Sequence, residues 1–301
     1  DSVRTGVPGD TDRTKMLFDH CYTYVVENGM LEAYHRELRL APVMSRASLK
    51  GVRVDMEALE ADIAKYTKAM KKSEDYLLKR LGDFNIDSDK ELAEALDKAG
   101  QVTEWVLTPT GKRSTARKNL VGRIKDPALL THLAYRGVLA TCLGTFAMPW
   151  LEAAQRQGGR LHPQWNQVRG DRGANGDLSG TRTGRMSCRD PNLQNVPNDF
   201  EGLSIPKGQP MPMEMRRYLL PEEGHIWLKR DFSAQEMRIM AHFAEGRLYE
   251  AFRNDPTTDP HVAVQKMIKE LLDMDMPRKY VKITGFGIMY GRGIANLSLA
   301  L

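Results

Sequence analysis

The segment that most constrains this chain is RKYVKITGFGIMYG, residues 278–291. Read as a helix, it places two cations and two aromatic rings four residues apart on one slowly drifting stripe: Arg278, Lys282, Phe286 and Tyr290. The stripe is roughly 18 Å long at about 1.5 Å per residue. It suits a ligand with a polyanion at one end and a flat ring at the other, as in a nucleoside triphosphate. A solvated cationic face beside core aromatics would give the same pattern.

A second segment, KRDFSAQEMRIMAHF at 229–243, places Asp231 between two predicted elements. The apolar residues 226–228 predict a short strand before it. After it, apolar residues recur at helical spacing at Met237, Met240, Ala241 and Ala244. A carboxylate at such a junction can hold a hard cation against phosphate oxygens. A helix cap is the ordinary alternative.

The third segment, TRTGRMSCRDPNLQNVP at 181–197, is predicted to be irregular because prolines and asparagines interrupt it. Its amides and guanidinium groups are the usual contacts to base edges and phosphates. A surface loop with Asx-turns would carry the same residues. The four glycines of residues 170–180 predict a flexible turn, because no Gly-Lys-Ser/Thr follows as a phosphate loop requires.

Together these segments resemble the family A DNA polymerases, the group of bacterial DNA polymerase I and many phage replicases. The segment after Arg230 resembles the family's DYSQIELRVLAH, residues 278–291 its RxxxKxxxFGxxYG, and residues 183–197 its TGRLSSxDPNLQNIP. DPHVAV at 259–264 resembles DIHTxTA, and GVRVDMEAL and DFNIDSDKELAEAL resemble the segments that open the thumb. The resemblance covers nearly all of residues 30–301. The sequence departs from the family's usual residues at Phe232, Ala234, Gln235 and Gly285.

The resemblance implies an α+β, mostly helical fold with the right-hand polymerase architecture: a thumb, the first part of the palm and the start of the fingers. The implied divisions are 1–40 as the tail of an exonuclease-like region, 41–165 as thumb with its palm-proximal entry, 166–242 as first half of the palm, and 243–301 as start of the fingers. No His-Asp-Glu tripeptide, which carries the family's second catalytic carboxylate, and no exonuclease acids occur here. We therefore expect this piece alone not to extend a primer.

Capping residues and apolar spacing predict the thumb helices. Asp55 begins a helix that Gly82 ends, with a seam at Leu59, Ile63, Tyr66, Met70 and Leu77. Ser88 and Glu91 form a possible capping box for a helix to about Lys98. A second long helix is predicted over 129–151, with Tyr135, Leu139, Phe146 and Trp150 on one side. The basic loop 108–118 offers phosphate contacts, or only a solvated loop, through Lys112, Arg113, Arg117 and Lys118.

The family resemblance also implies roles for single residues. Asp231, with the carbonyl of Phe232, would hold two Mg²⁺ ions together with a second carboxylate missing from this chain. Asp231 and Lys282 would be catalytic; Arg278, Lys282 and His261 would hold the triphosphate. Phe286 would pack on the incoming sugar and base, Tyr290 would stack near the templating base, and Glu236 would exclude a 2′-hydroxyl. The minor groove of the primer terminus would meet Arg185, Asn192, Gln194 and Asn195.

The composition is compatible with a nucleic-acid-binding protein but does not establish one. Lys plus Arg number 44 against 39 acids, a net charge of +5 that fits a phosphate partner. Three widely spaced cysteines argue against a disulfide or zinc framework, and we find no transmembrane run or signal peptide. The implied partners are primer–template DNA and a dNTP, in the cytoplasm of a bacterial or phage-infected cell. A single-subunit RNA polymerase and a non-enzymatic primer–template binding fragment remain as alternatives; Glu236 and the DPNLQN run speak against the first.

Overall fold

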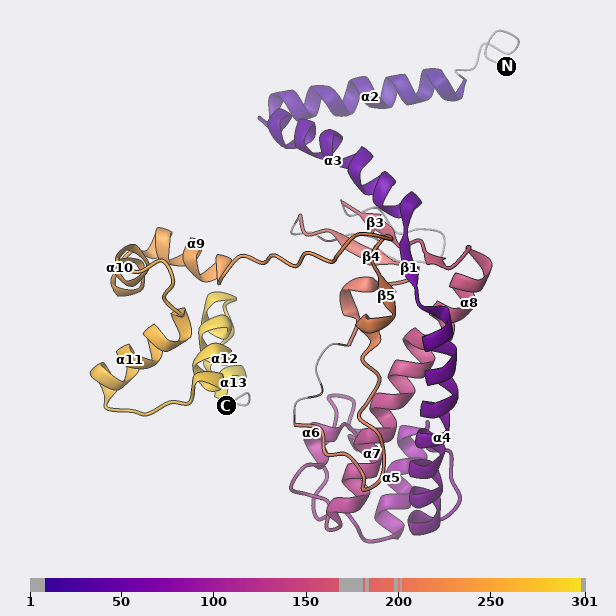
Figure 1. The fold of residues 1–301 in the computed structure, drawn as a ribbon. Coiled ribbons are helices and arrows are strands. Elements are labelled where there is room, and N and C mark those ends of the chain that lie inside the picture. Colours follow the sequence, from indigo (N-terminus) through magenta and orange to yellow (C-terminus); the bar gives the residue numbers. More distant parts are fainter. Residues whose placement is uncertain (1–8, 168–180, 182–183, 198–199, 201, 299–301) are drawn as a thin grey trace. The chain divides into compact units, whose positions relative to one another are not determined.

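The computed structural model describes residues 9–167, 181, 184–197, 200 and 202–298. The chain divides into two compact units, residues 1–226 and 227–301, each with its own set of elements (Figure 1). The fold is mostly helical with little sheet, as the sequence predicts. The division falls inside the predicted palm segment 166–242, and the predicted subdomain boundaries stay a prediction.

Two long helices form the body of the first unit. Helix α4 (Met56–Leu81) begins where Oδ1 of Asp55 accepts a hydrogen bond from the Ala58 amide at 3.0 Å. It ends at Gly82, whose φ of 91° is readily adopted only by glycine. Helix α7 (Pro127–Ala140) continues through a π-helical stretch (Thr141–Ala147) into α8 (Met148–Arg156). Both predicted long helices are confirmed.

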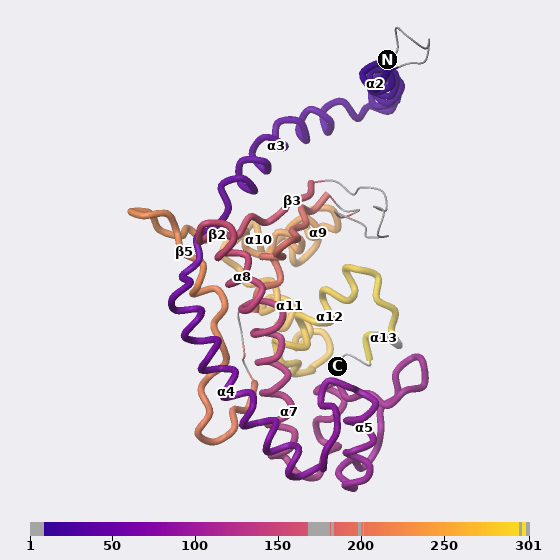
Figure 2. The backbone as a smooth tube through the Cα atoms, turned by 90° about the vertical axis from the view of Figure 1, so that its right-hand side faces the viewer, coloured from indigo at the N-terminus to yellow at the C-terminus, as the bar shows by residue number. Residues whose placement is uncertain are grey.

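Helix α4 packs along α7, and the two run side by side in Figures 1 and 2. The predicted seam residues Leu59, Tyr66 and Leu77 are buried, as are all four apolar residues predicted for the second helix. By length and composition alone the helix Pro127–Arg156 could cross a membrane. Its buried face, however, lies in the main core cluster of the unit, together with Leu59 and Tyr66.

A smaller layer of helices, together with the basic loop 108–118 between them, closes the far end of this pair, and we call this end the tip. Helix α5 (Asp89–Lys98) and the single turn α6 (Arg117–Leu120) join a second core cluster that includes Leu77, Leu96 and Leu129. Half of the predicted capping box forms, because Oγ of Ser88 accepts from the Glu91 amide at 3.3 Å. The Glu91 carboxylate instead accepts from the Asn85 amide at 2.9 Å.

A small antiparallel sheet lies at the other end of α4. Strand β1 (Val52–Val54) pairs with β2 (Arg160–Leu161) on one side and β5 (Leu219–Leu220) on the other. A separate pair joins β3 (Gln164–Asn166) to β4 (Ser187–Arg189). The 3-10 turn η3 (Met215–Tyr218) precedes β5, and its Tyr218 hydroxyl donates to the buried Asp62 carboxylate at 2.6 Å. This bond ties the sheet to α4.

The N-terminal helices α2 (Asp10–Glu27) and α3 (Leu31–Lys50) bury none of their side chains. Helix α2 begins at Asp10 with Gly9 as its N-cap; residues 1–8 lie outside the described part. The turn from α3 into β1 requires Gly51. Its φ is +66°, and a Cβ there would lie 2.5 Å from the Leu161 carbonyl oxygen.

The second unit is a set of helices: α9 (Gln235–Ala244), α10 (Arg247–Asn254), α11 (Pro260–Leu272), α12 (Arg278–Met289) and the short α13 (Ile294–Ser298). The helix predicted after Asp231 is confirmed by α9. The strand predicted before it is wrong, since residues 225–230 have no regular structure and Ile226 and Leu228 are each 85% exposed. A strand needs a neighbour for its backbone N–H and C=O groups, and no described residue pairs with this segment.

The sheet end of the first unit carries a pH-dependent ion pair. Nη1 and Nη2 of Arg160 donate to the two oxygens of Glu222 at 2.9 and 2.8 Å. These bonds lower the pKa of Glu222 from 4.5 to about 2. Between those values the unfolded state binds the proton more tightly, so the stabilisation is present above pH 4.5 and is lost as the pH falls toward 2.

We therefore expect Glu222→Gln to flatten the decline of unfolding free energy over this pH window, measured by urea unfolding at several pH values. Glu223→Gln is the control, because no described residue forms an ion pair with Glu223. Parallel pH curves for the wild type and Glu222→Gln would contradict the assignment.

Candidate functional site

The predicted stripe lies on α12 of the second unit. Arg278 is the first residue of the helix, Lys282 and Phe286 lie one and two turns further, and Tyr290 is the C-cap. The rings of Phe286 and Tyr290 stack with centroids 6.4 Å apart and planes 17° from parallel. Lys282 and Tyr290 are exposed. The predicted order of cations followed by rings is therefore present along one helix.

Asp259 connects this helix to the one before it. As N-cap of α11, its Oδ1 accepts from the amides of His261 at 2.8 Å and Val262 at 3.2 Å. Its Oδ2 accepts from Nη2 of Arg278 at 2.6 Å and from Nε at 3.2 Å. The hydrogen bond from Arg278 is the largest cause of a lowered pKa for Asp259, and the two amides add to it. The carboxylate is therefore held ionised between two helix starts.

His261 lies beneath the rings rather than at the surface. Its side chain is buried, and its ring centroid lies 5.7 Å from that of Phe286. Burial lowers the pKa of His261, the nearby Arg278 and Lys282 lower it further, and Asp259 opposes them. Its Nδ1 has no hydrogen-bond partner among the described residues. A neutral imidazole with one unused ring nitrogen therefore lies at the cationic stripe.

Two cavities share Phe286 as a wall. One, of about 240 Å³, is lined by residues of α9 and of the segment before it, including Asp231, Phe232, Glu236 and Met237. The other, of about 630 Å³, is lined by residues of α12 and the turn after it, including Lys282, Tyr290 and Arg292. The structure thus places Asp231 and Glu236 beside Phe286 of α12, although 55 residues separate Asp231 from Phe286 in the sequence.

The oxygen donors suit a hard cation in type but not in number. Asp231 is exposed, and the Phe232 carbonyl follows it directly in the chain. Within the described ranges no group of three His, Cys, Asp or Glu side chains could hold a metal ion. Because Mg²⁺ prefers octahedral oxygen coordination with carboxylate ligands, these residues make at most one side of such a site.

The predicted minor-groove residues lie in the first unit, where local side-chain bonds hold Asn192 and Gln194. Oδ1 of Asn192 accepts from the Gln194 amide at 3.0 Å, beginning the 3-10 turn η2 (Leu193–Asn195). Nε2 of Gln194 donates to the Met186 carbonyl at 3.1 Å. Arg185 and Asn195 are exposed. The Asx-turn alternative is thus present at Asn192, while residues 170–180, 182 and 183 lie outside the described part.

Asn192 and Asn195 also line a cavity of about 560 Å³ against Trp150 of α8. A nucleic acid seated here would meet amide groups on one wall and an apolar helix on the other. The contact of these residues with a primer stays a prediction.

The four predicted basic residues of the tip differ in the contacts that their side chains make within the chain. Arg113 forms an ion pair with Asp97, and its guanidinium lies 5.7 Å from the Trp105 ring. Arg117 donates to the Gly202 carbonyl. Lys112 and Lys118 are exposed, and no described residue forms an ion pair with either.

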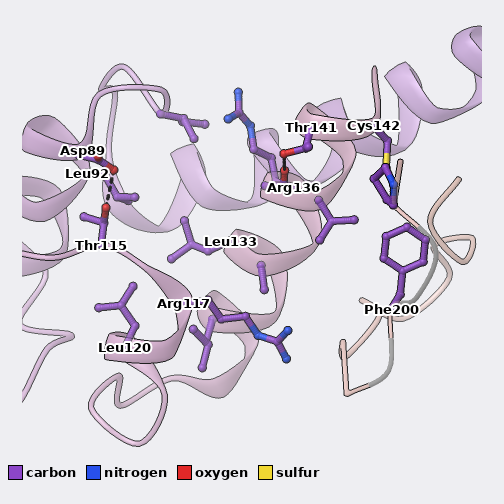
Figure 3. Close-up of a pocket in the computed structure, with 16 residues that line it drawn as sticks. Asp89, Leu92, Thr115, Arg117, Leu120, Leu133, Arg136, Thr141, Cys142 and Phe200 are labelled. Atoms are coloured by element: carbon purple, nitrogen blue, oxygen red, sulfur yellow. Dashed lines mark hydrogen bonds between the residues drawn. The ribbon is translucent and has the colours of Figure 1, made fainter. Parts of the chain in front are cut away.

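Arg117 also borders an apolar cleft of about 490 Å³ between the tip helices and α7 (Figure 3). Leu92, Leu120 and Leu133 form its floor, and Phe200 lies at its end. A hydrogen bond from Thr115 to Asp89 closes the opposite side. The cleft lies within the first unit and contains none of the predicted nucleotide-binding residues.

Sequence reasoning missed two residues of the second unit. Asp259 was noted only as part of a motif, because its contact with Arg278 spans 19 positions. Arg292 lines the larger cavity because it turns back over α12: a Cβ on Gly287 would lie 3.5 Å from its Cδ. The acid before a Pro-His pair is a readable N-cap signal; nothing in the sequence alone indicates the course of Arg292.

A sequence profile of DNA polymerase family A matches residues 56–301. The chain is 30% identical over 294 residues to the thermostable DNA polymerase I of Thermus filiformis, covering 96% of this chain and 33% of that protein. It is 29% identical over 294 residues to a DNA-directed DNA polymerase of Pseudomonas phage M6, covering 90% of this chain and 40% of that one. The chain thus spans about a third of the length of the curated relatives it matches.

Among solved structures, the chain resembles the POL domain of Pol1 from M. smegmatis, determined in complex with DNA primer-template and dNTP. The TM-score is 0.71 at 23% identity, over 92% of this chain and 46% of that one. At this identity the likeness establishes the fold. Together with the profile match, which extends over helices α4 and α7, Asp231 and the α12 stripe, it leads to one conclusion: this chain belongs to DNA polymerase family A.

Proposed function

We propose that this chain is the part of a DNA polymerase that grips primer–template DNA and receives the incoming dNTP for transfer to the primer 3′-hydroxyl. The observation that carries the proposal is the gathering of Asp231, Glu236 and Phe286 around one cavity, with Lys282 and Tyr290 on the other side of Phe286. Carboxylate, cation and ring are the three contacts that a nucleoside triphosphate and its metal need. The enzyme would act in the cytoplasm of a bacterial or phage-infected cell.

The triphosphate would lie at the cationic start of α12. Arg278 and Lys282 would neutralise its charge, and Lys282 would also stabilise charge that develops on the leaving pyrophosphate. His261, kept neutral by burial, could donate one hydrogen bond to a phosphate oxygen without adding charge. Phe286 would carry the sugar and base, and the exposed ring of Tyr290 would lie beside the templating base.

Asp231 would serve the metal. Its carboxylate and the Phe232 carbonyl would supply oxygen ligands to Mg²⁺, and at least one further carboxylate is required. Bound there, the metal would bring the attacking and departing oxygens into line and offset their charge. Glu236, on the wall of the same cavity, would fill the space needed by a 2′-hydroxyl. This would select deoxyribonucleotides and separates the proposal from an RNA polymerase.

The first unit would hold the duplex. Arg185, Asn192, Gln194 and Asn195 would face the minor groove, where every Watson–Crick pair presents acceptors and the readout is largely blind to sequence. The tip residues Lys112, Arg113, Arg117 and Lys118 would meet the phosphate backbone, which requires charge but no base recognition. Arg113 and Arg117 already have contacts within the chain, so Lys112 and Lys118 are the more available for DNA.

The assignment of Asp231 predicts a split between synthesis and binding. In the enzyme that carries this chain, Asp231→Asn should lower primer extension by at least about a hundredfold, because an oxygen ligand to the metal is lost. Primer–template affinity should stay within about threefold, since phosphate contacts dominate it. Glu250→Gln, an exposed acid on α10 that lines neither cavity, is the matched control. Near-normal extension by Asp231→Asn would remove Asp231 from the chemistry.

The exposed lysines of the tip predict that the DNA affinity of the 301-residue chain falls as the salt concentration rises. Lys112→Ala and Lys118→Ala should each lower the slope of log affinity against log salt by about 0.9 on duplex DNA, one phosphate contact apiece. Arg113→Ala should change that slope less, because Asp97 already pairs with its guanidinium. Lys90→Ala, an exposed lysine of α5, controls for net charge. Unchanged slopes for both lysine variants would place the DNA elsewhere.

A further inference from the structure

The two oxygens of Asp259 have separate tasks. Among the described residues, Oδ1 accepts only from the backbone amides that begin α11, at 2.8 and 3.2 Å. Oδ2 accepts from Arg278, at 2.6 Å from Nη2 and 3.2 Å from Nε, and from no other residue in the described ranges. Because the amides fix the carboxylate to a helix end, its position does not depend on the arginine. The Asp259 carboxylate is therefore held in place by α11, and it in turn restrains the more flexible Arg278 side chain.

The bond geometry occupies one edge of the guanidinium and leaves another open. A guanidinium offers five N–H donors in a rigid plane, and either its Nε–Nη2 edge or its Nη1–Nη2 edge can meet an oxyanion with two bonds. Asp259 takes the first edge. Within the part of the chain that the structure describes, Nη1 donates to no residue, and the Arg278 side chain is 51% exposed. The free edge can therefore receive a phosphate bidentately.

We propose that Asp259 is a positioning residue that holds Arg278 by its Nε–Nη2 edge so that its Nη1–Nη2 edge receives a phosphate of the nucleoside triphosphate. The inference rests on the proposed function, which places the triphosphate at the start of α12. Asp259 itself touches no phosphate. Its contribution is to fix a side chain that would otherwise lose several rotatable bonds of freedom on binding.

Asp259 could also weaken triphosphate binding instead of strengthening it, and the two effects can be told apart by experiment. A carboxylate beside a phosphate site repels the ligand, and it could compete with the ligand for the same arginine. If Asp259 only competed, its removal would tighten triphosphate binding. If Asp259 only capped α11, any replacement that keeps the cap would leave binding unchanged.

Two substitutions separate the cap from the ion pair. In Asp259→Asn the amide oxygen can still cap α11, since Asn and Asp are equally good N-caps, while the amide nitrogen cannot accept from Arg278. Asp259→Ser also keeps a capping oxygen but is too short to reach across to α12. Far-UV circular dichroism and thermal melts would establish that both variants fold like the wild type. If one does not, the other takes its place.

The measurement is the dissociation constant of the chain, bound to primer–template in magnesium, for dNTP and separately for inorganic tripolyphosphate. Arg278→Ala should weaken dNTP binding about tenfold, and Asp259→Asn about three- to fivefold, because a charge-assisted bidentate contact is lost or misaligned. Tripolyphosphate should show the same ratios, since the contact is to phosphate alone. In the Arg278→Ala background, Asp259→Asn should have no further effect.

Tighter binding by Asp259→Asn, or no change, overturns the proposal. So does a loss that persists at full size in the Arg278→Ala background, because Asp259 would then act through the cap or through His261. These results leave the proposed function standing as long as Arg278→Ala itself weakens the triphosphate. If Arg278→Ala binds dNTP as the wild type does, the placement of the triphosphate fails, and the inference fails with it.

Discussion

Burial of apolar surface along one helical seam holds the first unit together. Leu59 and Leu77 of α4 and Leu139 of α7 have essentially no exposed surface, and each contributes about 1.5–3 kcal/mol relative to an exposed side chain. The seam joins a core at the sheet end to a smaller core at the tip. The basic loop and the DPNLQN segment both attach to this frame, so its rigidity sets the distance between the two predicted DNA contacts.

The second unit combines a small buried core with an ion pair at the start of α12. Among its described residues only a few side chains, including Met237, Ala241 and Val281, belong to the buried set. The start of α12 is instead fixed to the start of α11 by the Asp259–Arg278 pair. Arg278 and Lys282 remain at the surface and His261 stays uncharged beneath the rings. A site for a polyanion can therefore exist here without burying an uncompensated cation, which would be costly.

The sequence was a good guide where the signals are local. Asp55 and Gly82 bound α4, Ser88 begins α5, and the stripe of α12 follows helical spacing, because caps and periodicity act over a few residues. Residues 226–228 misled, because apolar character alone does not make a strand when no described segment pairs with it. Helices α2 and α3 also went unpredicted, and neither has a buried side chain.

The site was predictable in composition but not in arrangement. The motifs named Asp231, Glu236 and the α12 residues, yet only tertiary structure brings Asp231 and Glu236 to a cavity that Phe286 also lines. Bonds between separate motifs, such as Asp259 to Arg278, and the return of Arg292 over Gly287 depend on tertiary geometry that no spacing encodes. The same holds for Asn192 and Gln194, whose local bonds could not be told from free amides.

The central claim is that α12 carries the nucleotide, with phosphates at its cationic start and the base at its rings. Its most direct test is a structure of this chain with primer–template, magnesium and an incoming dNTP analogue that cannot react. The account predicts triphosphate oxygens within hydrogen-bond distance of Lys282 and Arg278 and the base against Phe286. A nucleotide bound away from α12, with Phe286 and Tyr290 untouched, would contradict it.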